Sequence, residues 1–524
     1  MFKKGLAIVG AFAVLLAIAF AAFALLKNET AVYESDDLTL TLTLTKPMFL
    51  SLGKTEVTER SIENVEDRMY TNDLKLLGFT LGTFEVTERK LGNDTRFVFE
   101  RFTNNSFFPL QLETTLSGLD HAEFKDWNPI TVEHEHHEDF GMDPTINPFG
   151  AVSFDGGEIL QGNVYLSSQL ETETSDGRMS YVRKLQKEVR GLELKKDTLE
   201  KSFWLPGRQI AESWLLAADE ALFDSEKAED EWIDYALHNQ TTQLNWLTSD
   251  GPYTKLPFSI EPSTKMGYGR TMGRFEDDVA LQWNTDSPSV FFEAMILNSR
   301  ANLLSYVEEF DGTRWPTEYT STWLKNAYGI TAPYVDTRYN EYVAFYLDRT
   351  AELYDENIEQ EELAVKVYAD YLLSRIEAGE TVKAGDSFLI ADYFDEDPDT
   401  AVPHASLNHE LGGLKILLTA YHETDEDKYL DAANQVISGM EQFGADDGGW
   451  IRETGDLWYQ ARPDGTFSGD DYPQLTLVDL LETQKLFEEL GMERNAYFDE
   501  MIQSKLDYLE SEGIELIEKV TNLM

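Results

Sequence analysis

A change in the spacing of apolar residues divides this chain and limits the folds that are open to it. Leucine and threonine alternate without interruption over Leu38–Thr45, which puts the leucines on one face of an extended strand. Similar strand-like runs follow at Phe79–Thr87 and Thr95–Phe102, with turn-forming residues between them. We therefore expect residues 30–200 to form an antiparallel β-sandwich or barrel.

From Ser202 onward the spacing is that of helices. Leu407, Leu411, Leu414 and Leu418 fall on one helical face. Helix pairs joined at one end by long loops are typical of an α/α-toroid, in which such loops build a cleft at one mouth. The fold class expected is therefore α+β and multidomain, with a toroid over residues 202–520. The long loops, rich in aromatic and acidic residues, are Phe310–Tyr319, Ala391–Pro403 and Gly444–Tyr472.

The N-terminus carries a long apolar segment. Gly5–Leu26 holds 22 residues without a charge, and a helix of that length spans about 33 Å, enough for a hydrocarbon core of about 30 Å. Lys3 and Lys4 precede it, which favours a cytoplasmic N-terminus. The expectation is a single-pass cell-membrane protein with residues 1–27 as tip and transmembrane anchor and an extracytoplasmic C-terminal domain. A cleaved signal peptide is the alternative.

Composition excludes several classes of partner and site. The chain has 96 acidic and 43 basic residues, a net charge of −53, so nucleic acid is not an expected partner. The acidity is spread along the whole chain, which favours a surface adapted to high salt. With no cysteine, disulfides, thiolate metal sites and thiol nucleophiles are ruled out.

A pentapeptide occurs twice in the β-rich part. Glu-Val-Thr-Glu-Arg stands at 56–60 and again at 85–89. An old duplication is one interpretation of the repeat. We favour coincidence between two similar edge strands.

Three segments of the helical half carry a resemblance to a known family, over about residues 288–487. They are a helix that ends in Asp311–Pro316, the stretch Asp392–Pro398 before a helix at Ser406–Leu414, and Asp471–Tyr472 before another helix. In this order and spacing they resemble the C-terminal domain of the D-glucuronyl C5-epimerases, which act on heparosan-type glycosaminoglycans. The order of anchor, β module and helical toroid is similar too. The resemblance implies an isomerase.

Inverting C5 of a uronate needs an acid, a base and a cation for the substrate carboxylate. The resemblance implies that tyrosines transfer the protons beside a glutamate. It places Tyr472 on one family tyrosine and Glu396 on the family glutamate. A further family tyrosine falls on Tyr459 or on Arg452, depending on where the gap in the alignment is placed. The chain departs from the family pattern at Asp397, where the family has a tyrosine, and at Pro473, where it has a histidine.

Cations and tryptophans in the same half are the candidates for binding the substrate. Arg452, Arg462 and Arg338 would neutralise a uronate carboxylate, and Trp315 and Trp458 would stack on sugar rings. Surface ion pairs are the alternative for the arginines, and burial in the helical core is the alternative for the tryptophans. The predicted partner is a polysaccharide or other glycan that contains uronic acid.

Two further function classes remain open. A polysaccharide lyase would need the same base and protonation of a leaving group at C4, whereas a glycoside hydrolase needs two carboxylates about 5–9.5 Å apart. A non-catalytic glycan-binding or envelope protein would keep the fold without the chemistry. The carboxylates open to a hydrolase are Asp392, Glu396, Asp456 and Asp470.

Histidines cluster in the β-rich part. On a strand, His134 and His136 would share a face that holds a divalent metal, with Glu138 or His121 as a third ligand. The favoured interpretation is an exposed acidic loop that contains histidines. Since the chain also has no glycine-rich phosphate loop and no His-Glu-x-x-His motif, we expect neither a metal nor a cofactor.

Overall fold

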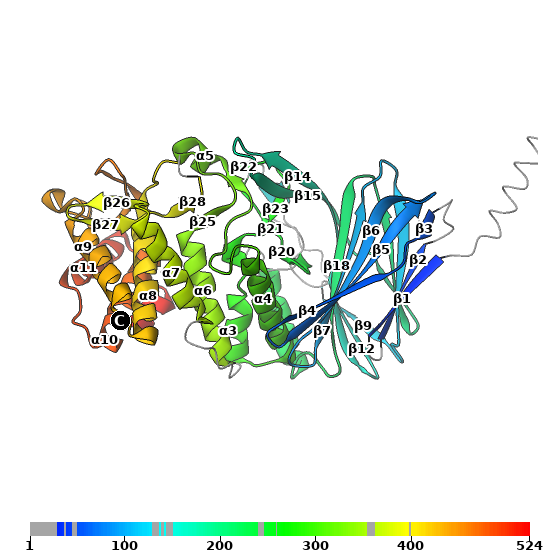
Figure 1. Cartoon of the computed structure of the whole chain (residues 1–524). Helices are drawn as coiled ribbons and strands as arrows, with labels where there is room; N and C mark the ends of the chain where they lie inside the picture. Colours follow the sequence, from blue (N-terminus) through cyan, green and yellow to red (C-terminus); the bar gives the residue numbers. More distant parts are fainter. Residues whose placement is uncertain are drawn as a thin grey trace, which may run out of the picture.

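The β-rich and helical regions lie at opposite ends of the molecule in the computed structural model. Figure 1 shows the sheets in blue and cyan at one end and the last helices in orange and red at the other. The structure describes residues 29–35, 38–44, 50–127, 136–137, 141–142, 150–238, 246–257, 259–353, 362–397 and 400–524.

Two antiparallel sheets make up the β-rich region. The smaller has the order β1 (Glu29–Ser35), β2 (Leu38–Leu44), β8 (Leu110–Ser117), β17 (Thr198–Leu205), β16 (Leu192–Lys195). The larger has the order β21 (Thr254–Lys255), β23 (Gly267–Gly269), β15 (Met179–Val189), β14 (Val164–Glu173), β18 (Gln209–Ala218), β7 (Arg96–Asn104), β6 (Phe79–Lys90), β5 (Val65–Leu76), β3 (Leu50–Leu52). Attached to it are β4 (Glu56–Ile62), β9 (Glu123–Asp126), β12 (Gly150–Phe154) and β13 (Gly157–Gln161).

The larger sheet separates two hydrophobic cores. All four leucines of β2 are buried, and they form a core between the sheets with Val98 and Phe102 of β7. Phe97 and Phe99 point to the other face of β7 and join the core that the sheet shares with the helices. Each fully buried leucine or phenylalanine contributes about 1.5–3 kcal/mol relative to an exposed one. The leucine alternation of β2 therefore reports the core between the sheets, and β7 contributes side chains to both cores.

Strands continue beyond Ser202, where the sequence predicts that helices begin. β17 ends at Leu205 and β18 runs to Ala218. Most of β18 is buried because one face meets the smaller sheet and the other meets the helices. A strand buried on both faces gives a continuous apolar run, which periodicity cannot distinguish from a buried helix. The division into domains near residue 200 stays a prediction.

The helical region is a row of helix hairpins. α4 packs on α6, α6 on α8, and α8 on α10, while α7, α9 and α11 pack outside this row. Closure of the row into a toroid stays a prediction. The helices are α2 (Glu226–His238), α3 (Asp278–Asp286), α4 (Val290–Glu308), α5 (Thr322–Tyr328), α6 (Thr337–Leu353), α7 (Ala364–Glu377), α8 (Leu407–Thr424), α9 (Asp427–Gln442), α10 (Leu475–Glu489), α11 (Ala496–Glu512) and α12 (Glu518–Leu523).

Short strands join the loops at one end of the helices, which we call the mouth. β25 (Tyr334–Asp336), before α6, pairs with β28 (Tyr393–Asp395) in the loop that leads to α8. β29 (Ala405–Ser406), at the start of α8, pairs with β30 (Trp458–Ala461) in the loop that leads to α10. Thr317 of the first long loop forms a β-bridge with Tyr334 of β25, so the three long loops meet where α6, α8 and α10 begin. The β-rich region touches them too, because Arg178 between β14 and β15 binds Asp395.

Two-stranded pairs complete the structure. They are β10 (His136–His137) with β11 (Gly141–Met142), β19 (Leu247–Thr248) with β20 (Gly251–Pro252), β22 (Ile260–Glu261) with β24 (Thr320–Ser321), and β26 (Thr381–Ala384) with β27 (Ser387–Ile390). A last short strand, β31 (Phe467–Asp470), extends the pair of β29 and β30.

The expected membrane anchor has to be corrected. In the part of the chain that the structure describes, no helix combines the length and the apolarity that a bilayer crossing requires. This finding contradicts the prediction of a transmembrane helix and of a single-pass cell-membrane protein. The segment 5–26, on which that prediction depended, lies outside the described residues. Its 22 apolar residues gave a local signal alone, and no later step relies on it.

Candidate functional site

Aromatic rings line the mouth in an unbroken series of contacts. Ring centroids are 5.6 Å apart between Trp323 and His404, 6.4 Å between His404 and Tyr459, and 5.6 Å between Tyr459 and Tyr472. The two ends of the series are open to solvent, with Trp323 48% and Tyr472 44% exposed. We call this set the ring cluster; its members are Trp323, Tyr328, Tyr393, His404, Tyr459 and Tyr472.

Three segments supply these rings, namely α5, the loop that leads to α8 and the loop that leads to α10. α5 carries Trp323 and Tyr328 and stops at Gly329, whose φ of 82° lies in the left-handed region that glycine adopts freely. Tyr393 lies on β28 and Tyr459 on β30, and these strands are held by their pairing to β25 and β29. Strand pairing thus fixes the backbone that carries Tyr393 and Tyr459.

A tyrosine, a histidine and an aspartate form a relay at the centre of the ring cluster. The Tyr328 hydroxyl is 3.0 Å from Nδ1 of His404. On the other side of the ring, Nε2 of His404 is 3.0 Å from a carboxylate oxygen of Asp392. His404 and Asp392 are both fully buried, and Tyr328 is partly exposed. The Nε2 contact has ion-pair length without hydrogen-bond geometry, as is common in catalytic contacts before a substrate binds.

Asp392 is held as a carboxylate. Its oxygens accept a hydrogen bond of 2.6 Å from the Ser406 backbone and another from the Ser406 hydroxyl. Burial alone would raise the pKa of Asp392, but His409, His404 and Ser406 outweigh it and lower that pKa. A negative Asp392 favours the tautomer of His404 with its proton on Nε2, which leaves Nδ1 free to accept the Tyr328 proton.

A second histidine and a second aspartate adjoin the relay. Nδ1 of His409 is 2.7 Å from the Thr337 hydroxyl and 3.8 Å from Asp392. Asp336 caps α6 by accepting hydrogen bonds from the backbone of Arg338 and Tyr339. Burial, partly offset by His409, raises the pKa of Asp336. Two carboxyl groups with opposite pKa shifts are the arrangement that acid–base chemistry uses.

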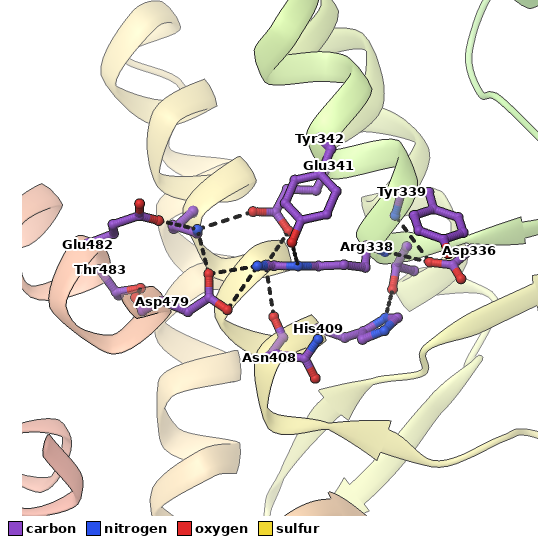
Figure 2. A network of polar contacts seen from close by, with 12 residues as sticks. Asp336, Arg338, Tyr339, Glu341, Tyr342, Asn408, His409, Asp479, Glu482 and Thr483 are labelled. Carbon is purple, nitrogen blue, oxygen red and sulfur yellow. Dashed lines mark hydrogen bonds and ion pairs between the residues drawn. The ribbon is translucent and has the colours of Figure 1, made fainter. Parts of the chain in front are cut away.

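Beneath the ring cluster lies a buried ionic network, drawn in Figure 2. Arg338 of α6 binds both carboxylate oxygens of Asp479 on α10, at 2.8 and 2.9 Å, and Glu341 at 2.7 Å. Lys415 of α8 binds Asp479 at 3.0 Å and Glu482 at 2.9 Å. Arg338 also donates to the Asn408 backbone, at 3.1 Å. The network therefore locks three helices together at the mouth.

Glycine at position 412 makes room for this network. A Cβ atom there would lie 2.0 Å from a carboxylate oxygen of Glu341 and 2.9 Å from Nη1 of Arg338. Both groups are fixed by ion pairs and cannot withdraw cheaply. The close approach of α8 to α6 thus depends on this glycine.

The acid dependence of stability offers a first prediction. Burial would raise the pKa of Glu482, but Lys415 and Lys519 outweigh it and lower the pKa to about 2. A depressed pKa stabilises the folded chain at every pH above the pKa of a glutamate in the unfolded chain, which is about 4.3. This stabilisation is lost as the pH falls toward 2. Between pH 5 and pH 3, we expect the free energy of unfolding to fall about 2 kcal/mol less in Glu482→Gln than in the wild type.

Urea denaturation at both pH values measures this difference. Glu231→Gln is the matched control, because Glu231 forms an exposed pair with Lys227 on α2. Its acid dependence should equal that of the wild type. An unchanged acid dependence in Glu482→Gln would contradict the assigned ion pairs.

Of the three predicted catalytic residues, the two tyrosines lie together and the glutamate lies apart from them. Tyr472 and Tyr459 meet edge to face in the ring cluster. Burial, reinforced by Asp392, raises the pKa of Tyr459. Glu396 lies on the rim of the mouth, where it is mostly exposed and paired with Arg314. Their catalytic roles stay predictions.

The predicted substrate-binding residues have different surroundings. Arg452 binds Asp470 at 2.5 Å and lies over the ring of Trp458, 4.7 Å from its centroid. Arg462 is exposed in the turn between β30 and β31. Trp315 is 2% exposed and donates to the Leu303 backbone at 3.0 Å. Trp315 thus lies in the core, the alternative weighed for it, and Arg338 lies in the buried network.

Sequence reasoning gave no role to several residues at the mouth. Trp323 and Tyr328 lie on α5, between the first two long loops, and His404 follows the second. His409 falls inside the family-like segment without matching a family residue. The only sequence signal for the relay is that His404 and His409 flank the start of α8, 12 and 17 residues after Asp392.

The histidine cluster of the β-rich part is mostly untested. His134 and Glu138 lie outside the described residues, and only the backbone of His136 is described. His121 is exposed and binds Asp155 at 2.9 Å. Within the described ranges, no group of three or more histidine, aspartate or glutamate side chains could hold a metal ion.

Comparisons with known proteins give weak likenesses. No protein-family model matches the chain, and no curated protein matches it. A D-mannose isomerase is 13% identical, with a TM-score of 0.33 over 46% of this chain and 57% of the isomerase. The cellobiose 2-epimerase of Spirochaeta thermophila is 14% identical, with a TM-score of 0.33 over 50% of this chain and 64% of that protein.

A family 76 α-mannanase of Bacteroides thetaiotaomicron is a third solved structure that the chain resembles. It is 13% identical, with a TM-score of 0.31 over 46% of this chain and 59% of the mannanase. The match spans 57% to 64% of the three solved structures. None of the three is a D-glucuronyl C5-epimerase. TM-scores of this size do not establish a shared fold, so the chemistry of the mouth is argued from its own residues.

Proposed function

We propose that the ring cluster binds a carbohydrate chain and that the relay of Tyr328, His404 and Asp392 exchanges a proton with C5 of a uronate residue. The relay carries the proposal, because it joins a partly exposed hydroxyl through a buried imidazole to a buried carboxylate. Such an arrangement activates a hydroxyl whose own pKa is far above neutral.

The proton transfers follow from the order of the groups. Tyr328 gives its proton to Nδ1 of His404, and the negative Asp392 stabilises the imidazolium that forms. The phenolate then removes the proton from C5, and the electron pair moves into the carboxylate of the sugar. An acid on the other face returns a proton to C5, and Tyr472 stays the predicted group for that step. The imidazolium of His404 then releases its proton to solvent, and Tyr472 takes one from solvent. The products are the epimer and a regenerated enzyme, without an external oxidant or reductant.

The surroundings of Tyr328 suit an anionic sugar. Burial raises the pKa of Tyr328, while its contact with the His404 backbone and the charge of Arg462 act in the opposite direction. The same arginine is exposed and would neutralise a uronate carboxylate as its charge grows in the transition state. Trp323 and Tyr472 offer exposed rings on which neighbouring sugars stack.

Hydrolysis has less support. Of the four carboxylates considered for it, Glu396 is paired with Arg314, Asp470 with Arg452, and Asp456 with the buried Lys505 at 2.5 Å. Cations hold these three carboxylates, and a pair of free carboxylates is what the reaction needs.

Tyr328→Phe tests the proposal because it removes only the ionisable oxygen. We expect the rate of solvent-deuterium incorporation at C5 of heparosan or another uronan to fall about 10²–10⁴-fold. The melting temperature should change little, since the ring and its contacts remain. Tyr181→Phe, at an exposed tyrosine of β15, should keep full activity. Equal rates in wild type and Tyr328→Phe would refute the role of the relay.

Tyr472→Phe tests the predicted partner on the other face in the same assay. If Tyr472 is the acid, removing its hydroxyl should lower the rate of deuterium incorporation at C5 by a similar factor. A purely stacking role predicts an unchanged turnover in Tyr472→Phe and a raised KM in Tyr472→Ala. That second pattern would overturn its predicted role as an acid.

A further inference from the structure

The largest sheet and α4 enclose a cavity whose lining residues lie outside the ring cluster. Its volume is about 440 Å³, within the range of about 300–1,000 Å³ that is usual for small-molecule sites. Strands β4, β5 and β6 form one wall and α4 forms the other. The loop at Ser249 and Asp250 closes one end, together with Arg270.

The repeated pentapeptide builds the sheet wall. Residues 56–60 lie on β4 and residues 85–89 on β6, and these two strands pair with opposite edges of β5. Among the strands that the structure describes, β4 pairs with β5 alone, whereas β6 also pairs with β7. The interpretation of the repeat as two edge strands is therefore wrong for β6. The third residue of each copy, Thr58 in one and Thr87 in the other, lies opposite Met69 of β5.

The last residue of each copy repeats this arrangement two residues further along its strand. Arg60 and Arg89 are both registered with Asp67 of β5. Since side chains two residues apart point to the same face, the threonine row and the arginine row lie side by side. Residues of both rows line the cavity. The repeat thus surrounds one strand with the same pair of side chains on each side.

The helix wall adds polar groups at helical spacing. Asn302, Ser305, Tyr306 and Glu309 all line the cavity and share one face of α4 and its C-terminal end. Among the described residues, the buried Ser305 hydroxyl oxygen has no hydrogen-bond partner. A buried hydroxyl without a partner costs free energy that a ligand hydroxyl would recover.

The buried charges that line the cavity are already paired. Arg89 uses all five of its donors, on both oxygens of Asp67, on Asn298, on Asn302 and on the Ser249 backbone. A buried arginine so engaged has no hydrogen left for an anion. Asp67 in turn is neutralised by Arg89 and offers no net charge to a cation.

Arg270 and Asp250 at the cavity follow the same rule. Arg270 binds both oxygens of Glu318 and the Asp250 backbone, at 3.1 Å. Asp250 binds Arg101. Burial would raise the pKa of Asp250, but Arg101 and Arg270 outweigh it and lower that pKa to about 2. The buried charges at the cavity are therefore compensated, and the exposed carboxylate of Glu309 at its edge disfavours an anionic ligand.

We propose that this cavity binds a neutral sugar residue. Hydrogen-bonding groups whose buried charges are compensated suit the hydroxyls of such a ligand. They are the hydroxyls of Thr58, Thr87 and Ser305 and the remaining lone pairs of Asp67. Met69, 37% exposed, offers an apolar surface to the C–H face of the ring. The inference does not rest on the function proposed for the mouth, because the two sites share no lining residue.

Saturation-transfer NMR with the full chain tests the proposal. The probes are D-glucose, D-galactose, D-mannose and N-acetylglucosamine, each at millimolar concentration. Thr58→Trp places a large ring at the exposed rim of the cavity and should abolish binding. Val57→Trp is the matched control, because Val57 is the neighbouring exposed residue of β4 and does not line the cavity. Ser305→Ala should weaken binding about five- to tenfold through one lost hydrogen bond.

Trp323→Ala, in the ring cluster, separates this inference from the function of the mouth. The cavity predicts the same binding in Trp323→Ala as in the wild type. Binding that disappears in Trp323→Ala and survives in Thr58→Trp would place the sugar at the mouth and overturn the inference. Absence of binding for all four probes in the wild type would overturn it as well. Melting curves of each variant confirm that the chain is folded.

Discussion

Asp392→Asn is expected to lower the rate of proton exchange at C5 about 10⁴-fold, the factor that loss of the carboxylate costs in a serine–histidine–aspartate triad. The substituted amide keeps an oxygen for the Ser406 backbone, so the loop before α8 should stay in place. Its amide nitrogen, however, faces Nε2 of His404 with a donor. The imidazole then favours a proton on Nδ1 and no longer accepts the proton of Tyr328.

Activity and melting temperature have to be measured together for this variant. Asp464→Asn is the matched control, because Asp464 is exposed in the turn between β30 and β31 and its side chain binds Thr466. It should keep the wild-type rate. A rate for Asp392→Asn within a few-fold of the wild type would remove Asp392 from the mechanism. A large fall in melting temperature would assign it a structural role.

Asp479→Ala is expected to have the largest effect on stability. The substitution leaves Arg338 and Lys415 buried without the carboxylate that bridges them. Removing one partner of a buried ion pair costs about 3–5 kcal/mol, since the remaining charge stays desolvated. The cost should appear as a lower midpoint of urea denaturation.

Two variants sharpen this test. Glu231→Ala removes an exposed pair on α2 and should cost less than about 1 kcal/mol. Arg338→Met combined with Asp479→Leu replaces both charges by apolar groups and should be less destabilised than Asp479→Ala alone. If Asp479→Ala cost no more than Glu231→Ala, the network would not hold the three helices together.

Local patterns in the sequence predicted the parts of the fold that depend on local spacing. The alternation at Leu38–Thr45 predicted a strand with one buried face, and the leucine spacing after Leu407 predicted a helix. The sequence did not predict β18 as a strand, because a strand buried on both faces shows no alternation of apolar and polar residues. The membrane prediction was wrong: among the described residues no helix is long and apolar enough to cross a bilayer.

The site was harder to predict because its pairs are distant in the sequence. Arg338 and Asp479 are 141 residues apart, and Tyr328 and His404 are 76 residues apart. The aromatic loops showed where the mouth would lie. The relay could not be predicted, since pairing of β25 with β28 and of β29 with β30 is what brings Asp392 and His404 beneath α5. The same holds for the repeated pentapeptide, whose two copies meet through β5.

Proton exchange at C5 is the most direct test of the central claim. Heparosan and other uronans are incubated with the full chain in D₂O, and deuterium at C5 is followed by NMR. We expect the wild type to incorporate deuterium at C5 of at least one uronan, and Tyr328→Phe and Asp392→Asn to do so far more slowly at unchanged melting temperature. Chains cut to unsaturated or reducing ends, or binding to the ring cluster without any exchange, would contradict it.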